Sequence, residues 1–245
     1  MKAILKKVIH SLGYEYQRQS ERTFNMDPGF VELYERCKPF TMTSPERMHA
    51  LFQAVRHVVK LQVPGDFVEC GVWRGGSCMM IAHTLLQMGV KDRQLRLFDT
   101  FEGMSKPTEL DRNVHGVVAE EKWQVTDAGR EWCAASLEDV KQNMAGTGYP
   151  VEHITYIQGK VEDTLPAGAP EAVSLLRLDT DWYESTRQEL VSLYPKLSRH
   201  GILILDDYGH WAGAKKAVDE YFLDHPDPVL FNRIDKSGRL AIKLV

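Results

Sequence analysis

Four aspartates in this sequence could do chemistry, because each follows an apolar run at a point where a strand should end. Asp179 and Asp181 follow one such run, and Asp206 and Asp207 follow another. Carboxylates crowded together repel one another and need a compensating cation at neutral pH. Oxygen ligands of this kind suit Mg²⁺ or Ca²⁺, and no His or Cys flanks them at the spacing typical of zinc. The sequence therefore predicts a site for a hard divalent cation.

Some of these acids have a simpler interpretation. Asp181 could cap the N-terminus of a helix that begins near Ser185, because Asp is a favoured N-cap residue. The same interpretation is weaker for Asp206 and Asp207, since two adjacent acids after an all-apolar strand exceed what one cap needs. Asp179 is the first acid after its strand and therefore lies at the sheet edge where ligands bind in an open α/β fold.

A second motif lies nearer the N-terminus. An expected strand at 66–71 runs into Gly71, Gly75 and Gly76, and a helix follows. Glycines let a backbone approach a ligand, and the helix start offers free N–H groups. Asp99 ends the next strand, at the distance where an acid commonly accepts ribose hydroxyls. A plain tight turn is the alternative, but the acid that follows favours a nucleotide-like ligand.

The hydrophobic pattern predicts strands alternating with helices, which is typical of an α/β fold with a parallel sheet. The expected strands are 66–71, 94–98, 154–157, 175–178, 202–205, 229–234 and 240–245. The expected helices are 45–60, 77–88, 137–144, 184–197 and 213–223. The turn at 236–238 joins the last two strands as an antiparallel hairpin. Thr43 or Ser44, followed by Pro45, marks the first helix start.

Composition limits the class of protein. The chain has 245 residues, of which 43% are hydrophobic and 26% charged, with a formal net charge of −4. These values fit one large soluble α/β domain. The negative net charge gives no excess of basic residues for binding nucleic acid, so a nucleic-acid partner is not expected. No apolar run approaches the roughly 20 residues that span a bilayer. None of the four cysteines forms a C-x-x-C pair, so we expect free thiols and a cytoplasmic protein.

The chain divides into a helical extension at 1–60, expected to help cover the cofactor and substrate, and a main domain at 61–245. Residues 1–20 have an amphipathic helical pattern that could lie on a membrane surface, on a second subunit or on its own domain, of which the last is favoured. Residues 103–135 are polar and would form a lid-like insertion. The helix and the insertion offer contact surface, so a homo-oligomer is expected. Within the insertion, Trp123 and Trp132 could line a pocket for a ring-shaped substrate; the alternative is a loosely packed surface insertion.

The motifs FVECGVWRGGS, LFDTFEGM, LLRLDTDWYEST, LYPKLSRHG and ILILDDYG together resemble the macrocin O-methyltransferase (TylF-type) family. This resemblance covers roughly residues 40–222. It implies a Rossmann-like class I methyltransferase fold, with a seven-stranded mostly parallel sheet, an antiparallel terminal hairpin and helices on both faces. It also implies an enzyme that uses S-adenosylmethionine and Mg²⁺ to methylate sugar hydroxyls of antibiotics and related natural products.

The resemblance carries roles to individual positions. It implies cofactor binding by residues of the glycine loop, the second strand and the turn after the third strand, namely Glu69, Gly71, Gly75, Ser77, Asp99, Gly159, Glu162 and Asp163. Thr43 and Ser44 fall, more loosely, in a region that can cover the cofactor. It implies Mg²⁺ binding by Asp179, Asp206 and Asp207, and we expect Asp179 to be the general base as well.

The predicted chemistry is consistent with these residues. Methyl transfer to an alcohol requires the two reactants to be held in line. A Mg²⁺ chelated by a vicinal diol would lower the pKa of the attacking hydroxyl, and a nearby carboxylate could accept its proton. His210 and His115 are rival bases. The acceptor is therefore expected to be a small molecule with neighbouring hydroxyls, and the resemblance implies that it is glycosylated.

Three alternatives stay open at this point. A catechol-type O-methyltransferase acting on an aromatic diol would use the same metal geometry. A non-catalytic cofactor-binding module is disfavoured because all four acids are present. A dinucleotide oxidoreductase is less consistent still, since the first loop reads G-x-x-x-G-G rather than G-x-G-x-x-G.

Overall fold

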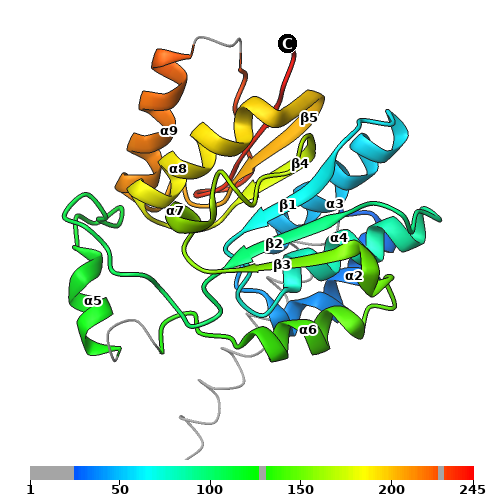
Figure 1. Ribbon diagram of the computed structural model, residues 1–245, viewed down its shortest axis with the longest axis horizontal. Coiled ribbons are helices and arrows are strands. Elements are labelled where there is room, and N and C mark those ends of the chain that lie inside the picture. The colour runs from blue at the N-terminus through cyan, green and yellow to red at the C-terminus, as the bar shows by residue number, and fades with distance from the viewer. Residues whose placement is uncertain (1–24, 127–130, 226–228) are drawn as a thin grey trace, which may run out of the picture.

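Seven strands form one sheet at the centre of the computed structural model, which describes residues 25–126, 131–225 and 229–245 (Figure 1). The strands are β1 (Asp66–Cys70), β2 (Leu95–Asp99), β3 (Ile154–Gln158), β4 (Val173–Leu178), β5 (Leu197–Leu205), β6 (Asn232–Arg233) and β7 (Arg239–Ile242). Their order in the sheet is β3-β2-β1-β4-β5-β7-β6. The first five are parallel, and β7 is antiparallel to both of its neighbours.

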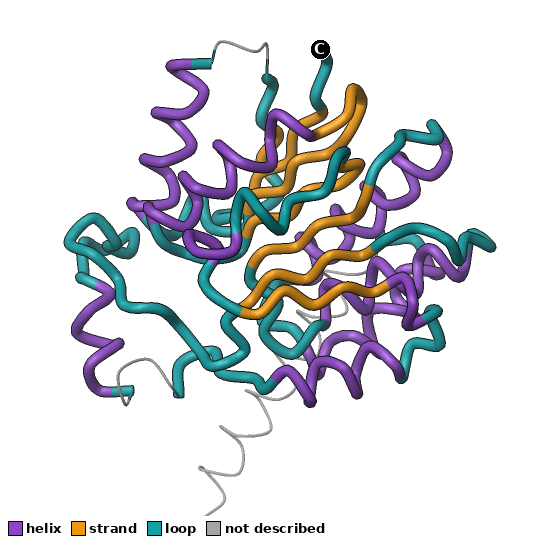
Figure 2. The backbone as a smooth tube through the Cα atoms, in the orientation of Figure 1, coloured by secondary structure: helices purple, strands orange, loops and turns teal. Residues whose placement is uncertain are grey.

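Helices cover both faces of this sheet (Figure 2). They are α2 (Pro28–Cys37), α3 (Pro45–Lys60), α4 (Gly76–Gln87), α5 (Ala119–Val125), α6 (Leu137–Ala145), α7 (Val161–Thr164), α8 (Tyr183–Leu193) and α9 (Ala212–Asp224). One core contains side chains of α2, α3, α4 and α6, and the other contains side chains of α7, α8 and α9. The predicted Rossmann-like α/β fold with an antiparallel end is confirmed.

Successive residues of a strand contribute their side chains alternately to these two cores. In β1, Phe67 packs with the α2–α4 side, whereas Val68 and Cys70 pack with the α8–α9 side. In β4, Leu175 and Leu176 divide in the same way. Side chains of a strand alternate between faces, so a strand buried on both faces reads as a nearly continuous apolar run. This pattern explains why the strands of the sequence could be recognised but their two faces could not.

The strand order reverses between β1 and β4. The chain extends the sheet from β1 through β2 to β3, and then returns to β4 on the other side of β1. At such a switch point the loops that follow the two strands diverge to opposite faces, which leaves a crevice outside their carboxyl ends. The loop after β1 begins at Gly71, and the loop after β4 begins at Asp179.

Several predicted boundaries differ from the structure. The helix expected at 184–197 is α8, which ends at Leu193, because Pro195 has no N–H to continue it. Strand β5 then starts at Leu197 rather than at 202. The terminal hairpin is shorter than predicted, whereas α3 has the predicted bounds and Ser44 caps it by accepting the Arg47 N–H at 3.2 Å. The amphipathic helix expected at 1–20 lies outside the described residues.

The insertion at 103–135 contains α5 and lies at the side of the molecule toward which β1 and β2 point (Figure 1). Its anchor is Asp111, whose side chain is 0% exposed. One carboxylate oxygen of Asp111 accepts the Tyr183 N–H at the start of α8 (2.8 Å), and the other accepts the Thr108 N–H (2.7 Å). In the part of the chain described, no helix is long and apolar enough to cross a membrane.

Asp111→Ala should therefore destabilise the protein. The change removes the acceptor for a helix N-terminal N–H and leaves buried donors unpaired, which costs about 1–3 kcal/mol of the free energy of unfolding. Urea unfolding followed by circular dichroism measures this loss. Glu109→Ala, at an exposed position of the same segment, is the matched control. Equal stability of the two variants would show that Asp111 does not anchor the insertion.

Candidate functional site

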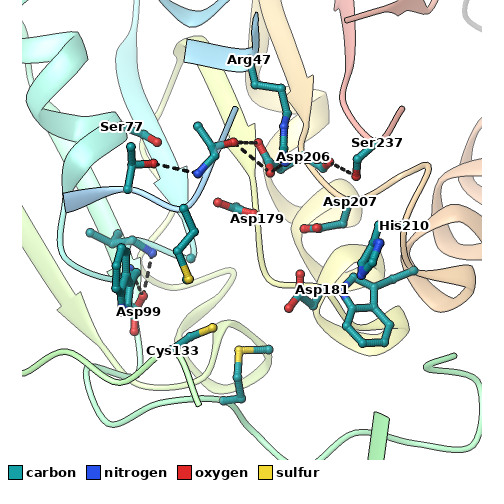
Figure 3. Close-up of a pocket in the computed structure, with 18 of the residues that line it drawn as sticks. Arg47, Ser77, Asp99, Cys133, Asp179, Asp181, Asp206, Asp207, His210 and Ser237 are labelled. Atoms are coloured by element: carbon teal, nitrogen blue, oxygen red, sulfur yellow. Dashed lines mark hydrogen bonds and ion pairs between the residues drawn. The ribbon is translucent and has the colours of Figure 1, made fainter. Parts of the chain in front are cut away.

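A cavity of about 370 Å³ opens at the switch point, outside the carboxyl ends of β1, β4 and β5 (Figure 3). Residues from several separate stretches of the chain line it. The residues predicted from the sequence that line it are Thr43, Glu69, Gly71, Ser77, Asp99, Trp132, Asp179, Asp206, Asp207 and His210. The structure thus brings the glycine loop and both aspartate motifs together around one space.

Arg177 is the charged centre beneath this cavity. It lies on β4, is 2% exposed, and binds three carboxylates. Its Nη1 contacts Glu69 Oε1 at 2.5 Å and Asp179 Oδ2 at 2.8 Å, and its Nη2 contacts Asp206 Oδ1 at 2.6 Å. Burial alone would lower the pKa of Arg177, but the three acids raise it well above its ordinary value. The cation is therefore permanent, and it fixes acids from three parallel strand ends.

Asp206 is held by a second arginine. Arg47 of α3 pairs with the other oxygen of the Asp206 carboxylate (Figure 3). Arg47 also pairs with Asp235, at 3.1 Å. The Asp206 backbone carbonyl accepts the Ser237 hydroxyl at 2.7 Å, and Thr43 donates to the Asp206 carboxylate at 3.1 Å. Asp206 therefore connects α3, β5 and the turn of the terminal hairpin.

Asp179, Asp181 and Asp207 form an acid cluster, in which one carboxylate oxygen from each lies within 4.8 Å of the others. Asp207 Oδ2 is buried and has no hydrogen-bond partner among the described residues. Burial raises the pKa of Asp179 well above its ordinary value, although Arg177 opposes this, and burial and Asp181 raise the pKa of Asp207. The cluster has too few positive neighbours for its charge, so its donor set fits a hard divalent cation.

Asp181 does not cap a helix. The N-cap of α8 is Trp182, whose side chain makes no capping bond, and the Asp111 carboxylate takes that role from the insertion. Asp181 has a φ of 70°, a conformation that few non-glycine residues adopt. This turn aims its carboxyl into the cavity, where burial, followed by Asp179, raises its pKa to about 7. The N-cap interpretation of Asp181 is therefore wrong.

The glycine loop lies on the opposite side of the cavity from Asp181 and Asp207. Gly71 has a φ of 83°, and a Cβ on it would lie 2.0 Å from the Asp179 carbonyl oxygen. Only glycine therefore allows the β1 and β4 loops to pass this closely. Gly75, with a φ of 89°, is the N-cap of α4 and lines neither of the two cavities at this edge. Ser77, in the first turn of α4, does line the larger one.

Asp99, at the end of β2, organises the loop after β1. One of its oxygens accepts the N–H groups of Val72 (2.6 Å) and Trp73 (3.0 Å), and the other accepts the Phe101 N–H at 2.7 Å. Trp73 and Phe101 both have positive φ values, 48° and 54°. The carboxylate therefore holds two tight turns while it lines the cavity.

A smaller cavity of about 70 Å³ adjoins the first and shares Gly71, Asp99 and Asp179 with it. The turn after β3 forms its far side, through Gly159 and Glu162. Predicted cofactor residue Asp163 is exposed and lines neither cavity. The two cavities thus adjoin along the carboxyl ends of β1, β2 and β4.

Aromatic side chains line the side of the larger cavity near Asp181. Trp132 and Trp211 line it, and both pack with Trp182, at centroid distances of 5.6 and 5.0 Å, and with each other, at 6.2 Å. Trp132 therefore does lie at a cavity wall, as the insertion's sequence suggested. Trp123 lies outside the cavity and donates to the Met104 carbonyl at 3.1 Å. His210 lines the cavity and packs against Trp211, while His115 is exposed and does not line it.

The two arginines were not predicted from the sequence. Arg177 interrupts an otherwise apolar strand, and a cation at a position expected to be buried is itself a signal of acids nearby. Arg47 carried no such signal, because it lies among several polar residues of an amphipathic helix. Only the folded chain shows that these two cations hold Asp206 while Asp181 takes a place beside Asp179 and Asp207.

Comparisons with known proteins agree with this arrangement. A model of the macrocin-O-methyltransferase (TylF) family matches residues 13–240. The chain is 36% identical over 224 residues to demethyldecarbamoylnovobiocin O-methyltransferase of Streptomyces niveus, covering 89% of this chain and 83% of that protein. It is 33% identical over 198 residues to mycinamicin III 3''-O-methyltransferase of Micromonospora griseorubida, covering 81% of this chain and 76% of that protein.

Solved structures show the same fold. The O-methyltransferase NovP superposes with a TM-score of 0.75 at 32% identity, covering 84% of this chain and 83% of that chain. The calicheamicin methyltransferase CalS11 superposes with a TM-score of 0.65 at 20% identity, covering 92% and 90%. At that lower identity, the second comparison supports the fold alone.

Arg177→Met should strongly destabilise the protein, because it leaves the buried Glu69 and Asp206 and the partly exposed Asp179 near one another without their shared cation. Removing one partner of a buried ionic network costs about 3–5 kcal/mol. Chemical unfolding measures the loss. The double variant Glu69→Gln/Arg177→Met should recover part of the lost free energy of unfolding, because it removes the negative charge of one unpaired carboxylate.

Arg187→Met, at an exposed position of α8, is the control for loss of an arginine as such. If Arg177→Met unfolded at the same denaturant concentration as this control, the three acids would not depend on Arg177.

Proposed function

Because the chain belongs to the macrocin-O-methyltransferase (TylF) family, we propose that its cavity transfers a methyl group from S-adenosylmethionine to a sugar hydroxyl. The observation that carries this proposal is the single cavity in which Gly71 and Asp99 face the acid cluster of Asp179, Asp181 and Asp207. A cofactor side and an acceptor side thus adjoin at the β1–β4 switch point. Holding two reactants in such proximity is the main requirement of methyl transfer.

The proposed cofactor site uses the two adjoining cavities. Asp99 is suited to ribose hydroxyls, and Gly159 and Glu162 lie where the base would be held. The loop at Gly71 allows a close approach of the amino-acid part, beside Glu69 and Ser77. S-adenosylmethionine supplies an activated methyl group when bound. Thr43 lines the same cavity, which supports a covering role for the helical segment before β1.

The proposed Mg²⁺ site includes Asp179 and Asp207. Their third partner is open between two acids: Asp206, which the family resemblance implies, and Asp181, which the acid cluster contains. Both oxygens of Asp206 contact arginines, whereas Asp181 is not part of that ion-paired network. Mg²⁺ would offset the charge of the cluster and lower the pKa of a bound hydroxyl. These observations favour Asp181 as the third carboxylate.

The chain's own groups then handle the proton. Asp179 is held by Arg177 at 2.8 Å with its carboxyl at the centre of the cavity, and we assign it the role of general base. His210 is the rival, since it lines the same cavity. The pKa of His210 is lowered by burial and by the cations Lys236 and Arg47, so its neutral form would be available to accept a proton.

The acceptor is proposed to be a glycosylated small molecule with a vicinal diol. Support for a glycosylated acceptor comes from the relatives, one of which is named as a 4'-O-methyltransferase of a 2,3-dimethoxyrhamnosyl-tetracenomycin. That acceptor has methoxy groups at the 2- and 3-positions, so the vicinal diol is proposed from the acid cluster and not from this relative. The aromatic wall of Trp132 and Trp211 could pack on a sugar ring while the acid cluster faces its hydroxyls.

We also propose that the protein is cytoplasmic and forms a homo-oligomer. Light scattering coupled to gel filtration would test the oligomeric state.

Asp207→Asn should weaken Mg²⁺ binding, because it neutralises a carboxylate whose Oδ2 has no other partner among the described residues. We expect at least a tenfold rise in the Mg²⁺ dissociation constant by calorimetry and a loss of methyl transfer of about 100-fold or more. Asp219→Asn, on the exposed face of α9, should leave both unchanged. Mg²⁺ binding of wild-type strength in Asp207→Asn would contradict the metal site.

Asp181→Asn and Asp206→Asn separate the two candidate third ligands. If Asp181 is the ligand, Asp181→Asn weakens Mg²⁺ binding without destabilising the fold, whereas Asp206→Asn lowers the free energy of unfolding by breaking its ion pairs. Calorimetry and urea unfolding of each variant give both quantities. Unaltered Mg²⁺ affinity in Asp181→Asn would return the role to Asp206.

A sugar diol should be methylated in preference to a phenolic diol. Rhamnosides and catechols compared at equal concentration, with methyl transfer followed by mass spectrometry, measure this choice. A deoxy rhamnoside that lacks the neighbouring hydroxyl should react about 100-fold more slowly, since it cannot chelate. Preference for the catechol would favour the aromatic-diol alternative.

A further inference from the structure

Glu189 is a buried carboxyl that the proposed methyl transfer does not use. It lies on α8 and is 0% exposed. Its Oε1 accepts the Thr180 hydroxyl at 2.9 Å, and its Oε2 is buried without a hydrogen-bond partner among the described residues. Its charged neighbours include the acids Glu162, Asp179 and Asp207. Burial is the main cause that raises the pKa of Glu189 well above its ordinary value, although the Thr180 hydrogen bond opposes this.

Thr180, the partner of Glu189, separates the two acids of the β4 loop. It lies between Asp179 and Asp181 in the sequence, and its hydroxyl also contacts Ser185 at 2.9 Å. Its backbone carbonyl accepts the Trp182 N–H at 2.8 Å, which closes the tight turn that contains Asp181. The side chain of Thr180 therefore connects this turn to α8.

Thr180 also lines the smaller cavity, together with Asp179 and Ser185. A shift of the Thr180 side chain would thus move the carboxylates of Asp179 and Asp181 and would also change the wall of the proposed cofactor site. A polar residue placed this way can orient ligands that it does not itself touch.

We propose that Glu189 is a positioning residue, which holds the Thr180 hydroxyl and thereby sets the Asp179–Asp181 turn for divalent-cation binding. A buried carboxyl without a cation partner is a cost to stability, and replacing such a group by an apolar residue of similar volume is often neutral or stabilising. The hydrogen bond to Thr180 is what Leu cannot supply. This inference rests on the proposed cation site.

The test compares two variants of Glu189 with one of its partner. Glu189→Leu and Thr180→Val each break the hydrogen bond, and each should raise the Mg²⁺ dissociation constant about 10–100-fold by calorimetry. Glu189→Gln keeps an acceptor for the hydroxyl and should bind Mg²⁺ within about threefold of wild type. The double variant Glu189→Leu/Thr180→Val should be no weaker than either single one, because both remove the same interaction.

Leu190→Ala is the matched control for general loosening of α8. Leu190 is buried in the helix core beside Glu189 and makes no contact that the proposal uses. This variant should be less stable to urea and yet keep the Mg²⁺ affinity of wild type. Equal weakening in Leu190→Ala, or wild-type affinity in Glu189→Leu, would overturn the positioning role.

Hydrogen exchange tests the same role without the metal. Glu189→Leu and Thr180→Val should exchange the Trp182 amide at least tenfold faster, whereas Glu189→Gln and Leu190→Ala should not. Unchanged protection in Glu189→Leu would refute the inference even if no variant binds Mg²⁺. If the wild-type protein did not bind Mg²⁺ but the exchange pattern were as expected, the cation site would be overturned. Glu189 would then remain the residue that orders the turn.

Discussion

The ion pairs of Arg177 are the interaction on which the site depends. Three carboxylates from the ends of β1, β4 and β5 converge on one guanidinium that water does not reach. Acids buried this close together would repel one another or take up protons without a fixed cation. Arg177 prevents this for Glu69, Asp179 and Asp206, and so allows an acidic cavity to exist inside a protein core. Arg47 extends the same compensation to the hairpin turn through Asp235.

Positive charge is not spread evenly over the acids, and this asymmetry gives the site its chemistry. Asp206 and Glu69 are neutralised by arginines, whereas Asp181 and Asp207 belong to the cluster that is left short of cations. The first pair supports the structure, and the cluster is where an added divalent ion would be stabilised most. Asp179 belongs to both groups, which places the proposed base at the boundary between the rigid network and the open cavity.

Much of this could be predicted from the sequence, for physical reasons. Strands buried on both faces leave continuous apolar runs, and the acids at 179, 181, 206 and 207 end two of them. Gly71 and Asp99 were recognisable because close backbone approach and ribose binding need those residue types. Contacts between residues that are distant in the sequence could not be recognised from it. Nothing local shows that Arg47 reaches Asp206, that Asp111 rather than Asp181 serves α8, or that Asp163 faces away from both cavities.

Calorimetric titration of the purified protein with S-adenosylhomocysteine, with and without Mg²⁺, tests the central claim most directly. The account predicts saturable one-to-one binding in both conditions, because the cavity around Gly71, Asp99 and Gly159 is complete without the metal. It also predicts a separate heat of Mg²⁺ binding, with a dissociation constant that Asp207→Asn raises at least tenfold. Absence of S-adenosylhomocysteine binding in both conditions would contradict the cofactor site, and with it the proposed methyl transfer.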